Sequence, residues 1–358
     1  MVKIPPFYMF QFANLEEKRR QRIEQLINLC HRYVAKYSVV SVDPLIFFMQ
    51  ISPNLTDFIR DYKFLFDSLK SKKAFVICNT SWHFEVAENI AQLEKLLVKF
   101  KNEYPNFTFI FLCNTLRQLD LFKGKGINAA FCNNNCFIDE KIFFPLSDTQ
   151  KKYDAVYDAR LVAWKRHYLA SEIDSLGLIY YAIPWLEDNS YMENILRDFA
   201  HARFFNHTET GECKKLNPPE INQILNECRI GLCLSAEEGA MYASMQYLLA
   251  GLPIVTTPST GGRDVFFDDE IALIVEPTPE AMKRGVKEMI GRNLSPARVR
   301  EKTLKTIMEH RPRFISLIQN IYEQEGIDRD FSKEWNRLFF NKLLGNLNHL
   351  EIVEQLKS

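Results

Sequence analysis

Residues 231–265 read GLCLSAEEGAMYASMQYLLAGLPIVTTPSTGGRDV, and this stretch decides the fold. An apolar run at 230–234 is followed by an acidic pair and a glycine, then by a helix-like segment at 240–250 that a glycine closes. A second apolar run at 253–257 leads into a pair of glycines. The order strand, loop, helix, strand and loop is typical of a doubly wound α/β sheet.

The two loops of this stretch, at 237–239 and 259–263, are the predicted ligand-binding loops. Each follows a predicted strand, and doubly wound sheets bind ligands at the carboxyl ends of their strands. Glycine lets backbone N–H groups come close to an anion, and the N-terminus of a following helix adds partial positive charge. We therefore expect both loops to lie beside an anionic ligand.

The same stretch resembles the donor-binding half of the retaining glycosyltransferases of family 4 (glycosyl transferases group 1), which have the two-domain GT-B fold. That family carries a glutamate followed by glycine, a second glutamate, and then a Gly-x-Pro turn into a strand. Glu238, Gly239, Gly251 and Pro253 match this pattern, whereas Gln246 stands where the second glutamate is expected. The resemblance implies two Rossmann-like domains facing each other across a cleft, with a C-terminal helix crossing back to the first.

A second match to the family lies in the segment YDARLVAWKRH at 157–167, which follows a predicted strand. The family pattern is Arg-Leu, three residues and Lys, and Arg160 and Lys165 occupy its two cationic positions. A planar guanidinium and a compact ammonium converging on one point suit a diphosphate. The resemblance implies that both residues hold the pyrophosphate of a nucleotide-sugar and stabilise the leaving nucleoside diphosphate. The alternative is a pair of solvated cations near a helix start, where the helix dipole disfavours them.

The resemblance also implies roles for Glu238 and Gln246 in donor binding. A carboxylate only accepts hydrogen bonds, so Glu238 can hold two sugar hydroxyls and offset positive charge on an oxocarbenium-like centre. Glu238 or Glu237 can instead cap the following helix. Gln246 occupies the position that contacts the ribose, where its amide can still accept one bond and donate another. Alternatively, Gln246 is a helix residue at the domain edge without a role in binding.

Further candidates surround these residues. By resemblance, Gly239, Gly261, Gly262 and Arg263 contribute to donor binding, although 257–262 also reads as a simple turn. His83 follows a predicted strand and is expected to project across the cleft as a catalytic residue; a lone histidine beside aromatic residues is more often packed. Weaker candidates for the donor or for acceptor hydroxyls are Ser259 and Thr260, Asn79, Thr80 and Glu85, and Asn133–Asn135.

The order of elements predicts an α/β protein with two domains. Strands alternating with helices imply parallel sheets. The predicted domains are an N-terminal, acceptor-side domain at 1–145, a C-terminal donor domain at 153–325, and helices at 326–358 that return to the first domain. Predicted strands lie at 38–51, 73–79, 107–112, 127–132, 153–157, 176–182, 202–206, 230–234, 253–257 and 271–275. Predicted helices lie at 85–101, 116–122, 165–173, 192–201, 218–227, 240–250, beyond 279 and at 331–356.

Composition limits the remaining classes of function. The chain of 358 residues has 45 basic and 45 acidic side chains. It therefore lacks the overall positive charge that attracts nucleic acid, and no nucleic-acid partner is expected. No apolar run approaches the roughly 20 residues that span a bilayer. The N-terminus does not resemble a secretory signal, and the scattered cysteines suit a reducing compartment. We therefore expect a cytoplasmic protein. The basic run at 18–22 leaves open a peripheral contact with the inner membrane face.

Metal binding is not expected, because Cys132 and Cys136 form the only close pair of cysteines and no second pair completes a zinc site. The predicted function is transfer of a hexose from a UDP- or GDP-sugar to a saccharide or lipid-linked acceptor, with retention of configuration. The nucleotide-sugar would be a co-substrate, and neither a cofactor nor a metal is expected. Two alternatives stay open: a nucleotide-sugar-binding protein without transferase activity, which Gln246 supports, and a GT-B nucleotide-sugar epimerase.

Overall fold

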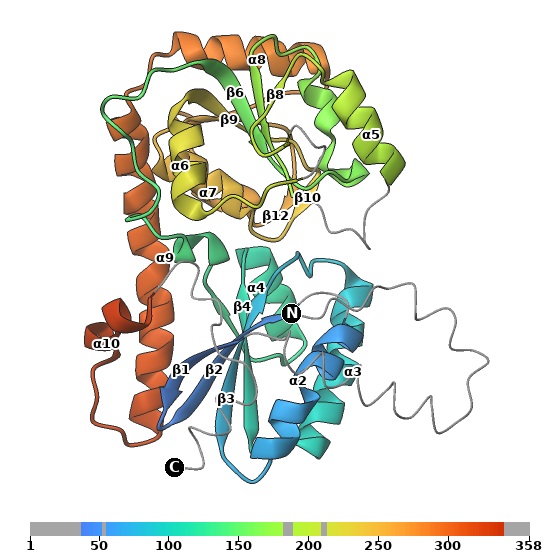
Figure 1. Cartoon of the computed structure of the whole chain (residues 1–358). Coiled ribbons are helices and arrows are strands. Elements are labelled where there is room, and N and C mark those ends of the chain that lie inside the picture. Colours follow the sequence, from blue (N-terminus) through green and yellow to red (C-terminus); the bar gives the residue numbers. More distant parts are fainter. Residues whose placement is uncertain (1–36, 52–54, 182–188, 209–212, 340–358) are drawn as a thin grey trace, which may run out of the picture.

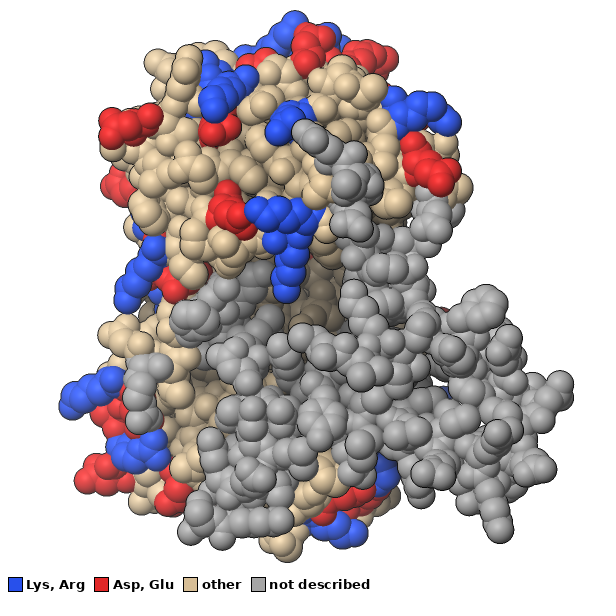
Figure 2. All heavy atoms as spheres, viewed as in Figure 1, with Lys and Arg blue, Asp and Glu red and all other residues tan. Residues whose placement is uncertain are grey.

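A computed structural model describes residues 37–51, 55–181, 189–208 and 213–339. These residues form two α/β units, each with its own sheet, and a long helix that runs alongside both (Figure 1). The basic run at 18–22 and the predicted helix beyond residue 339 lie outside the described residues. On the face shown in Figure 2, basic and acidic side chains are interspersed over both units.

The N-terminal unit contains a five-stranded sheet in the order β1-β2-β3-β4-β5. Strand β1 is antiparallel to β2, and the other pairs are parallel. The strands are β1 (Tyr37–Val42), β2 (Leu45–Ile51), β3 (Ala74–Thr80), β4 (Phe107–Cys113) and β5 (Ala129–Phe131). Every residue of β3 is buried, as expected for the central strand of a sheet covered on both faces.

The helices of this unit are α2 (Leu55–Leu69), α3 (Ala87–Glu103) and α4 (Leu116–Gly124). Helix α3 forms where the sequence predicts it, because Ile90, Leu93, Leu96 and Phe100 recur at helical spacing and are all buried. Thr115 starts α4 by accepting a hydrogen bond from the backbone N–H of Gln118. Helix α2 was not predicted from the sequence.

The C-terminal unit contains a six-stranded parallel sheet in the order β13-β11-β9-β6-β7-β8. Its strands are β6 (Tyr153–Asp158), β7 (Leu176–Ile179), β8 (Arg203–Phe204), β9 (Cys228–Cys233), β11 (Ile254–Thr256) and β13 (Ala272–Ile274). The chain runs outward from β6 through β7 to β8, returns to β9 beside β6, and then continues the other way. The order in which strands are added therefore reverses between β6 and β9. Open α/β sheets bind ligands at such switch points.

The helices of this unit are α5 (Asn189–Asp198), α6 (Pro218–Asn226), α7 (Tyr242–Leu249) and α8 (Pro279–Gly291). A reciprocal capping box between Asn217 and Glu220 starts α6. Two short strands, β10 (Glu237–Glu238) and β12 (Thr260–Gly261), pair in parallel and hold the two glycine-containing loops together. Residues 138–152, between the two sheets, contain no helix or strand.

The predicted helix at 165–173 is wrong. The structure has two short 3₁₀ turns instead, at Ala163–Lys165 and His167–Ala170. Arg166 between them has φ of 52°, in the left-handed region that interrupts a right-handed helix. Its side chain compensates, because Nε donates to the Leu234 carbonyl at 2.6 Å and Nη2 to Thr257 Oγ1 at 2.6 Å.

A C-terminal helix crosses back to the N-terminal unit as the predicted fold class requires, but it lies at 296–324, inside the predicted donor domain, and not at 326–358. Helix α9 (Pro296–Gln324) starts on the C-terminal unit and extends along the N-terminal one, followed by α10 (Phe331–Leu338) (Figure 1). Phe314 packs edge-on against Phe48 of β2, with ring centroids 5.8 Å apart. Arg311 donates to the Cys136 carbonyl and forms an ion pair with Glu140 at 2.9 Å. These contacts bury one face of the first sheet under a helix from the far end of the chain.

Candidate functional site

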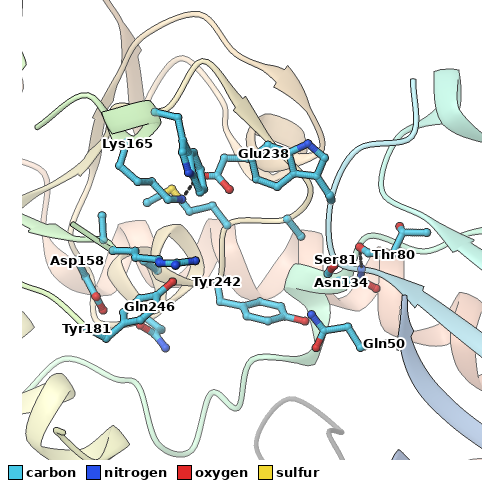
Figure 3. A pocket seen from close by; sticks show the side chains of 17 residues that line it. Gln50, Thr80, Ser81, Asn134, Asp158, Lys165, Tyr181, Glu238, Tyr242 and Gln246 are labelled. Atoms are coloured by element: carbon cyan, nitrogen blue, oxygen red, sulfur yellow. Dashed lines mark hydrogen bonds and ion pairs between the residues drawn. The ribbon is translucent and has the colours of Figure 1, made fainter. Parts of the chain in front are cut away.

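A cavity of about 490 Å³ lies between the two units, at the carboxyl ends of their strands. Figure 3 shows the side chains that line it, with Asp158 and Gln246 on one side and Ser81, Thr80 and Asn134 on the other. The C-terminal unit contributes Asp158, Ala159, Arg160, Trp164, Lys165, Tyr181, Glu238, Ala240, Met241, Tyr242, Ala243 and Gln246. The N-terminal unit contributes Gln50, Thr80, Ser81, Trp82 and Asn134. All charged lining residues thus come from the C-terminal unit.

Lys165 and Glu238 form an ion pair in this cavity, and both side chains are more than 90% buried. They come from segments far apart in sequence, since Lys165 ends a 3₁₀ turn after β6 and Glu238 lies in β10. The Lys165 ammonium also lies 4.2 Å from the centroid of the Trp164 ring, a favourable cation–π distance. Tyr157 fixes the backbone of Lys165, because its Oη donates to the Lys165 carbonyl at 2.7 Å.

Glu238 has a second partner that fixes its orientation. Ser235 Oγ donates to Glu238 Oε1 at 2.6 Å, and Lys165 contacts the same oxygen. Ser235 is fully buried in the turn that follows β9. The serine thus anchors one carboxylate oxygen, and Oε2 can accept hydrogen bonds from a ligand in the cavity.

The neighbouring histidine and tyrosine are electrically neutral at physiological pH. Burial, assisted by the charge of Lys165, lowers the pKa of His167 to about 3. Burial, followed by the charge of Glu238, raises the pKa of Tyr157 well above its usual value. The side chains of charged type that line the cavity are those of Asp158, Arg160, Lys165 and Glu238.

Gln246 lines the cavity from helix α7, and its side chain is largely buried. Helix α7 is tied to the end of β6, because the Asp158 backbone N–H donates to Tyr247 Oη at 2.6 Å. The Asp158 carboxylate also contributes to raising the pKa of Tyr247, whose largest cause is burial. The end of β6 and the 246–247 turn of α7 are therefore adjacent.

The loop glycines contact the N-terminal unit in this structure. A Cβ at Gly239 would lie 2.7 Å from the Ser81 carbonyl oxygen, and one at Gly262 would lie 2.8 Å from Asn133 Nδ2. Gly261 has φ of +100°, which disfavours any other residue. None of the three lines the cavity. Their small size thus allows the two units to approach closely beside the site.

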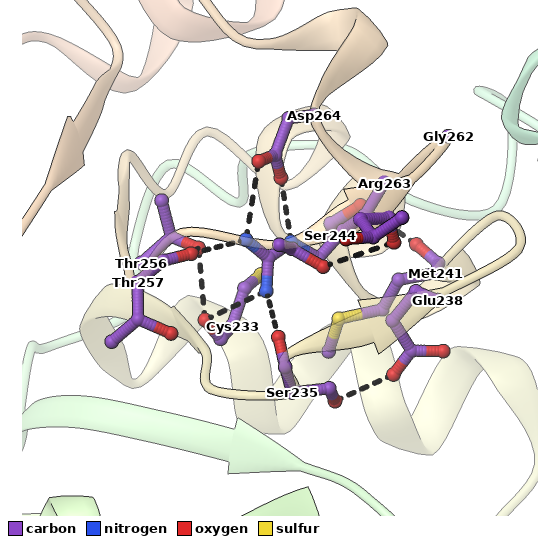
Figure 4. Close-up of polar contacts among 12 residues, drawn as sticks. Cys233, Ser235, Glu238, Met241, Ser244, Thr256, Thr257, Gly262, Arg263 and Asp264 are labelled. Carbon is purple, nitrogen blue, oxygen red and sulfur yellow. Dashed lines mark hydrogen bonds and ion pairs between the residues drawn. The ribbon is translucent and has the colours of Figure 1, made fainter. Parts of the chain in front are cut away.

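Arg263 is fully buried and does not line the cavity; Figure 4 shows its polar contacts. Its guanidinium donates to the carbonyls of Cys233 and Ser235 at 3.2 and 2.7 Å and to that of Thr257 at 2.5 Å. The other two N–H groups pair with the Asp264 carboxylate at 2.6 and 3.2 Å. All five donors are therefore used within the protein. Arg263 thus joins the ends of β9 and β11 in this structure, and its predicted donor contact stays a prediction.

His83 lies beside the cavity without lining it. The ring is buried, and Nε2 is 3.2 Å from Oε2 of Glu237 in the other unit. The preceding residue, Trp82, lines the cavity and packs edge-on against Trp164 at a centroid distance of 5.0 Å. The structure therefore places His83 at the contact between units, and its catalytic role stays a prediction.

The asparagines at 133–135 form a buried polar cluster at the ends of β4 and β5. Asn133 Nδ2 donates to the carbonyls of Asn114 and Gly262, the second of which crosses to the other unit at 2.7 Å. Asn134 lines the cavity; its Nδ2 donates to the Thr80 carbonyl, and its Oδ1 is buried without a hydrogen-bond partner among the described residues. A buried amide oxygen of this kind can accept a bond from a ligand hydroxyl.

The structure brings Arg160, Lys165, Glu238 and Gln246 together, as the sequence indicated. Sequence reasoning missed Asp158, Trp82, Trp164, Tyr181 and Tyr242, which also line the cavity. Asp158 could have been noticed as the last residue of a strand at a switch point, whereas the aromatic residues carry no positional signal. Of the weaker candidates, only Thr80 and Asn134 line the cavity; Asn79, Glu85, Ser259 and Thr260 do not.

The described residues contain neither a metal-binding cluster nor a membrane-spanning helix. No three His, Cys, Asp or Glu side chains gather there as a metal-binding group. No described helix is both long and apolar enough to cross a bilayer.

The sequence matches no protein-family model and no curated protein. The structure is similar to sucrose-phosphate synthase from Thermosynechococcus elongatus, with a TM-score of 0.52 and 12% identity over 75% of this chain and 77% of that one. HepE from Anabaena, in complex with UDP and glucose, has a TM-score of 0.52 and 12% identity over 74% of this chain and 73% of that one. TarM has a TM-score of 0.52 and 13% identity over 75% of this chain and 54% of that one. The chain therefore has the two-domain, Rossmann-like GT-B fold of these glycosyltransferases.

Proposed function

We propose that this protein is a glycosyltransferase that moves a sugar from a nucleoside-diphosphate-sugar to a saccharide or lipid-linked acceptor. The observation that carries the proposal is the cavity at the β6–β9 switch point, where Arg160 and Lys165 face the same space as Glu238. Cations suited to a diphosphate and a carboxylate suited to sugar hydroxyls are thus combined in one site. The UDP and glucose bound to HepE, which shares the fold, support this donor class.

In this proposal Arg160 and Lys165 bind the donor diphosphate and stabilise the charge of the departing nucleoside diphosphate. Positioned cations that meet developing negative charge lower the barrier for such a step. The ammonium of Lys165 is already paired with Glu238 and stacked on Trp164, so it is held at the cavity before a donor binds. Charge neutralisation by these two side chains supports a metal-independent reaction.

Glu238 would contact the transferred sugar. Its second carboxylate oxygen can accept sugar hydroxyls, and its charge can stabilise an oxocarbenium-like centre. Retention of configuration is proposed from the resemblance of residues 238–253 to family 4. The acceptor would enter against the uncharged N-terminal side, where Trp82 offers an aromatic face and Asn134 an unsatisfied amide oxygen.

Product analysis tests the proposal against its alternatives. The purified chain would be incubated with UDP- and GDP-sugars, with and without saccharide and lipid-linked acceptors, and nucleotide release and sugar products would be measured. Acceptor-dependent release of UDP or GDP with a new glycosidic bond supports a transferase. Binding without turnover would support a nucleotide-sugar-binding protein, a reading that the amide at Gln246 favours. Conversion of the donor sugar alone would indicate an epimerase.

Arg160→Ala is expected to weaken nucleoside diphosphate binding by about 1.5–3 kcal/mol, because a charge-assisted contact to phosphate is lost. Calorimetric titration with UDP and GDP measures the change. Arg229→Ala is the matched control, since Arg229 lies on β9 of the same sheet and is half-exposed beside Asp154. Equal affinities of the wild-type and Arg160→Ala proteins would remove the diphosphate assignment.

A further inference from the structure

The departure at Gln246 raises the question of which group binds the ribose diol. A carboxylate is well suited to that task, because both of its oxygens accept hydrogen bonds and the bonds are charge-assisted. In dinucleotide-binding Rossmann folds, an acidic residue about 20 residues beyond the glycine-rich turn binds the ribose 2′-hydroxyl in this way. Gln246 is neutral, so it can supply only one amide oxygen as an acceptor.

Asp158 places a carboxylate on the same side of the cavity. It is the last residue of β6, at the β6–β9 switch point, and it lines the cavity together with Gln246 (Figure 3). The hydrogen bond from its backbone N–H to Tyr247 fixes the end of β6 against the turn of α7 that carries Gln246. Asp158 and Gln246 therefore face a common space.

We propose that Asp158 is the ribose-binding carboxylate of this protein and replaces the acid that is absent at position 246. This inference rests on the proposed function, because it requires a nucleoside diphosphate in the cavity. The 2′- and 3′-hydroxyls of the ribose donate to the Asp158 carboxylate, and the Gln246 amide makes an auxiliary contact. Arg160, two residues along the chain, binds the adjoining diphosphate.

The arrangement has a consequence for specificity. A nucleotide that lacks the diol loses its charge-assisted hydrogen bonds to the Asp158 carboxylate, so it should bind more weakly. The site should therefore favour ribonucleotides over dideoxyribonucleotides, whatever base the donor carries. A residue that only neutralised Arg160 would not discriminate between them.

The test compares binding of UDP, 2′,3′-dideoxy-UDP and inorganic pyrophosphate by calorimetry, with GDP and its dideoxy counterpart in parallel. Asp158→Asn is expected to lower UDP or GDP affinity about tenfold, because bonds to a charged acceptor are roughly twice as strong as neutral ones. Affinity for the dideoxy nucleotide should already be low in the wild type and should not fall further. Pyrophosphate affinity should not decrease, since a nearby negative charge is removed.

Two further variants complete the design. Asp154→Asn, in the same strand but half-exposed near Arg229, is the matched control and should bind UDP normally. In the double variant Asp158→Asn/Gln246→Glu, the acid is moved to the position that the family pattern uses, and most of the lost affinity should return. Rescue of this kind would not follow from a purely structural role of Asp158.

The outcomes separate the inference from the function on which it rests. If the wild type binds UDP or GDP but Asp158→Asn lowers affinity for ribose and dideoxyribose nucleotides equally, or for neither, the ribose assignment is overturned and the transferase proposal stands. If pyrophosphate affinity falls in parallel, Asp158 acts through Arg160 and the assignment is again overturned. If the wild type binds no nucleotide and no pyrophosphate, the proposed function and the inference both fail.

Discussion

Glu238→Gln is expected to lower turnover by about 10²–10³-fold while leaving donor affinity nearly unchanged. The amide keeps the shape of the side chain and one hydrogen-bond acceptor, but it removes the negative charge. In the proposed reaction that charge is needed most when positive charge develops on the transferred sugar. A loss confined to the transition state therefore appears in kcat and in kcat/KM, not in donor binding.

The ion pair with Lys165 sharpens this expectation. In the structure Glu238 forms an ion pair with the Lys165 ammonium. Glu238→Gln releases the lysine from its anionic partner, and the ammonium becomes more available to the donor diphosphate. Nucleoside diphosphate affinity should thus be unchanged or slightly higher, and the contrast between binding and turnover should be clear.

Glu237→Gln is the matched control for this experiment. Glu237 is the adjacent carboxylate, but its side chain is 60% exposed and contacts His83 outside the cavity. Steady-state kinetics and calorimetry on both variants decide the matter. A similar loss in both variants, or a loss of donor affinity alone in Glu238→Gln, would mean that Glu238 only holds Lys165 in place.

Much of the site could be predicted because it follows from strand order. Arg160, Lys165, Glu238 and Gln246 lie in segments after strands of one parallel sheet, and the carboxyl ends of such strands meet at one edge. The spacing of apolar residues likewise predicted α3 and the strands of both sheets. Periodicity and motif spacing therefore gave the edge on which the charged residues gather.

What could not be predicted depended on contacts between distant segments. The left-handed backbone of Arg166 is stabilised by Leu234 and Thr257, which no local pattern reveals. The sequence predicts that the loop glycines lie beside an anionic ligand. In the structure the Gly262 carbonyl accepts a hydrogen bond from Asn133 of the other unit. In each case the local sequence permits several conformations, and packing across the units selects one.

The most destabilising change we expect is Arg263→Met, at a residue whose sequence context suggested ligand binding. Arg263 is fully buried, and its five N–H groups are bound by three carbonyls and by Asp264. Methionine fills a similar volume but satisfies none of these acceptors. Removing one partner of a buried, hydrogen-bonded ion pair typically costs about 3–5 kcal/mol of folding free energy.

Differential scanning calorimetry measures this effect as a lowered thermal midpoint. Arg263→Lys should also be destabilising, because an ammonium has three donors and cannot reproduce the planar fork that reaches both strand ends. Arg298→Met is the control: Arg298 is half-exposed and pairs with Glu270 at the surface, where ion pairs contribute little. A normal midpoint in both Arg263 variants, together with weaker UDP or GDP binding, would instead restore Arg263 to the donor site. Because all five donors face protein acceptors, we expect the midpoint to fall and any loss of binding to follow from it.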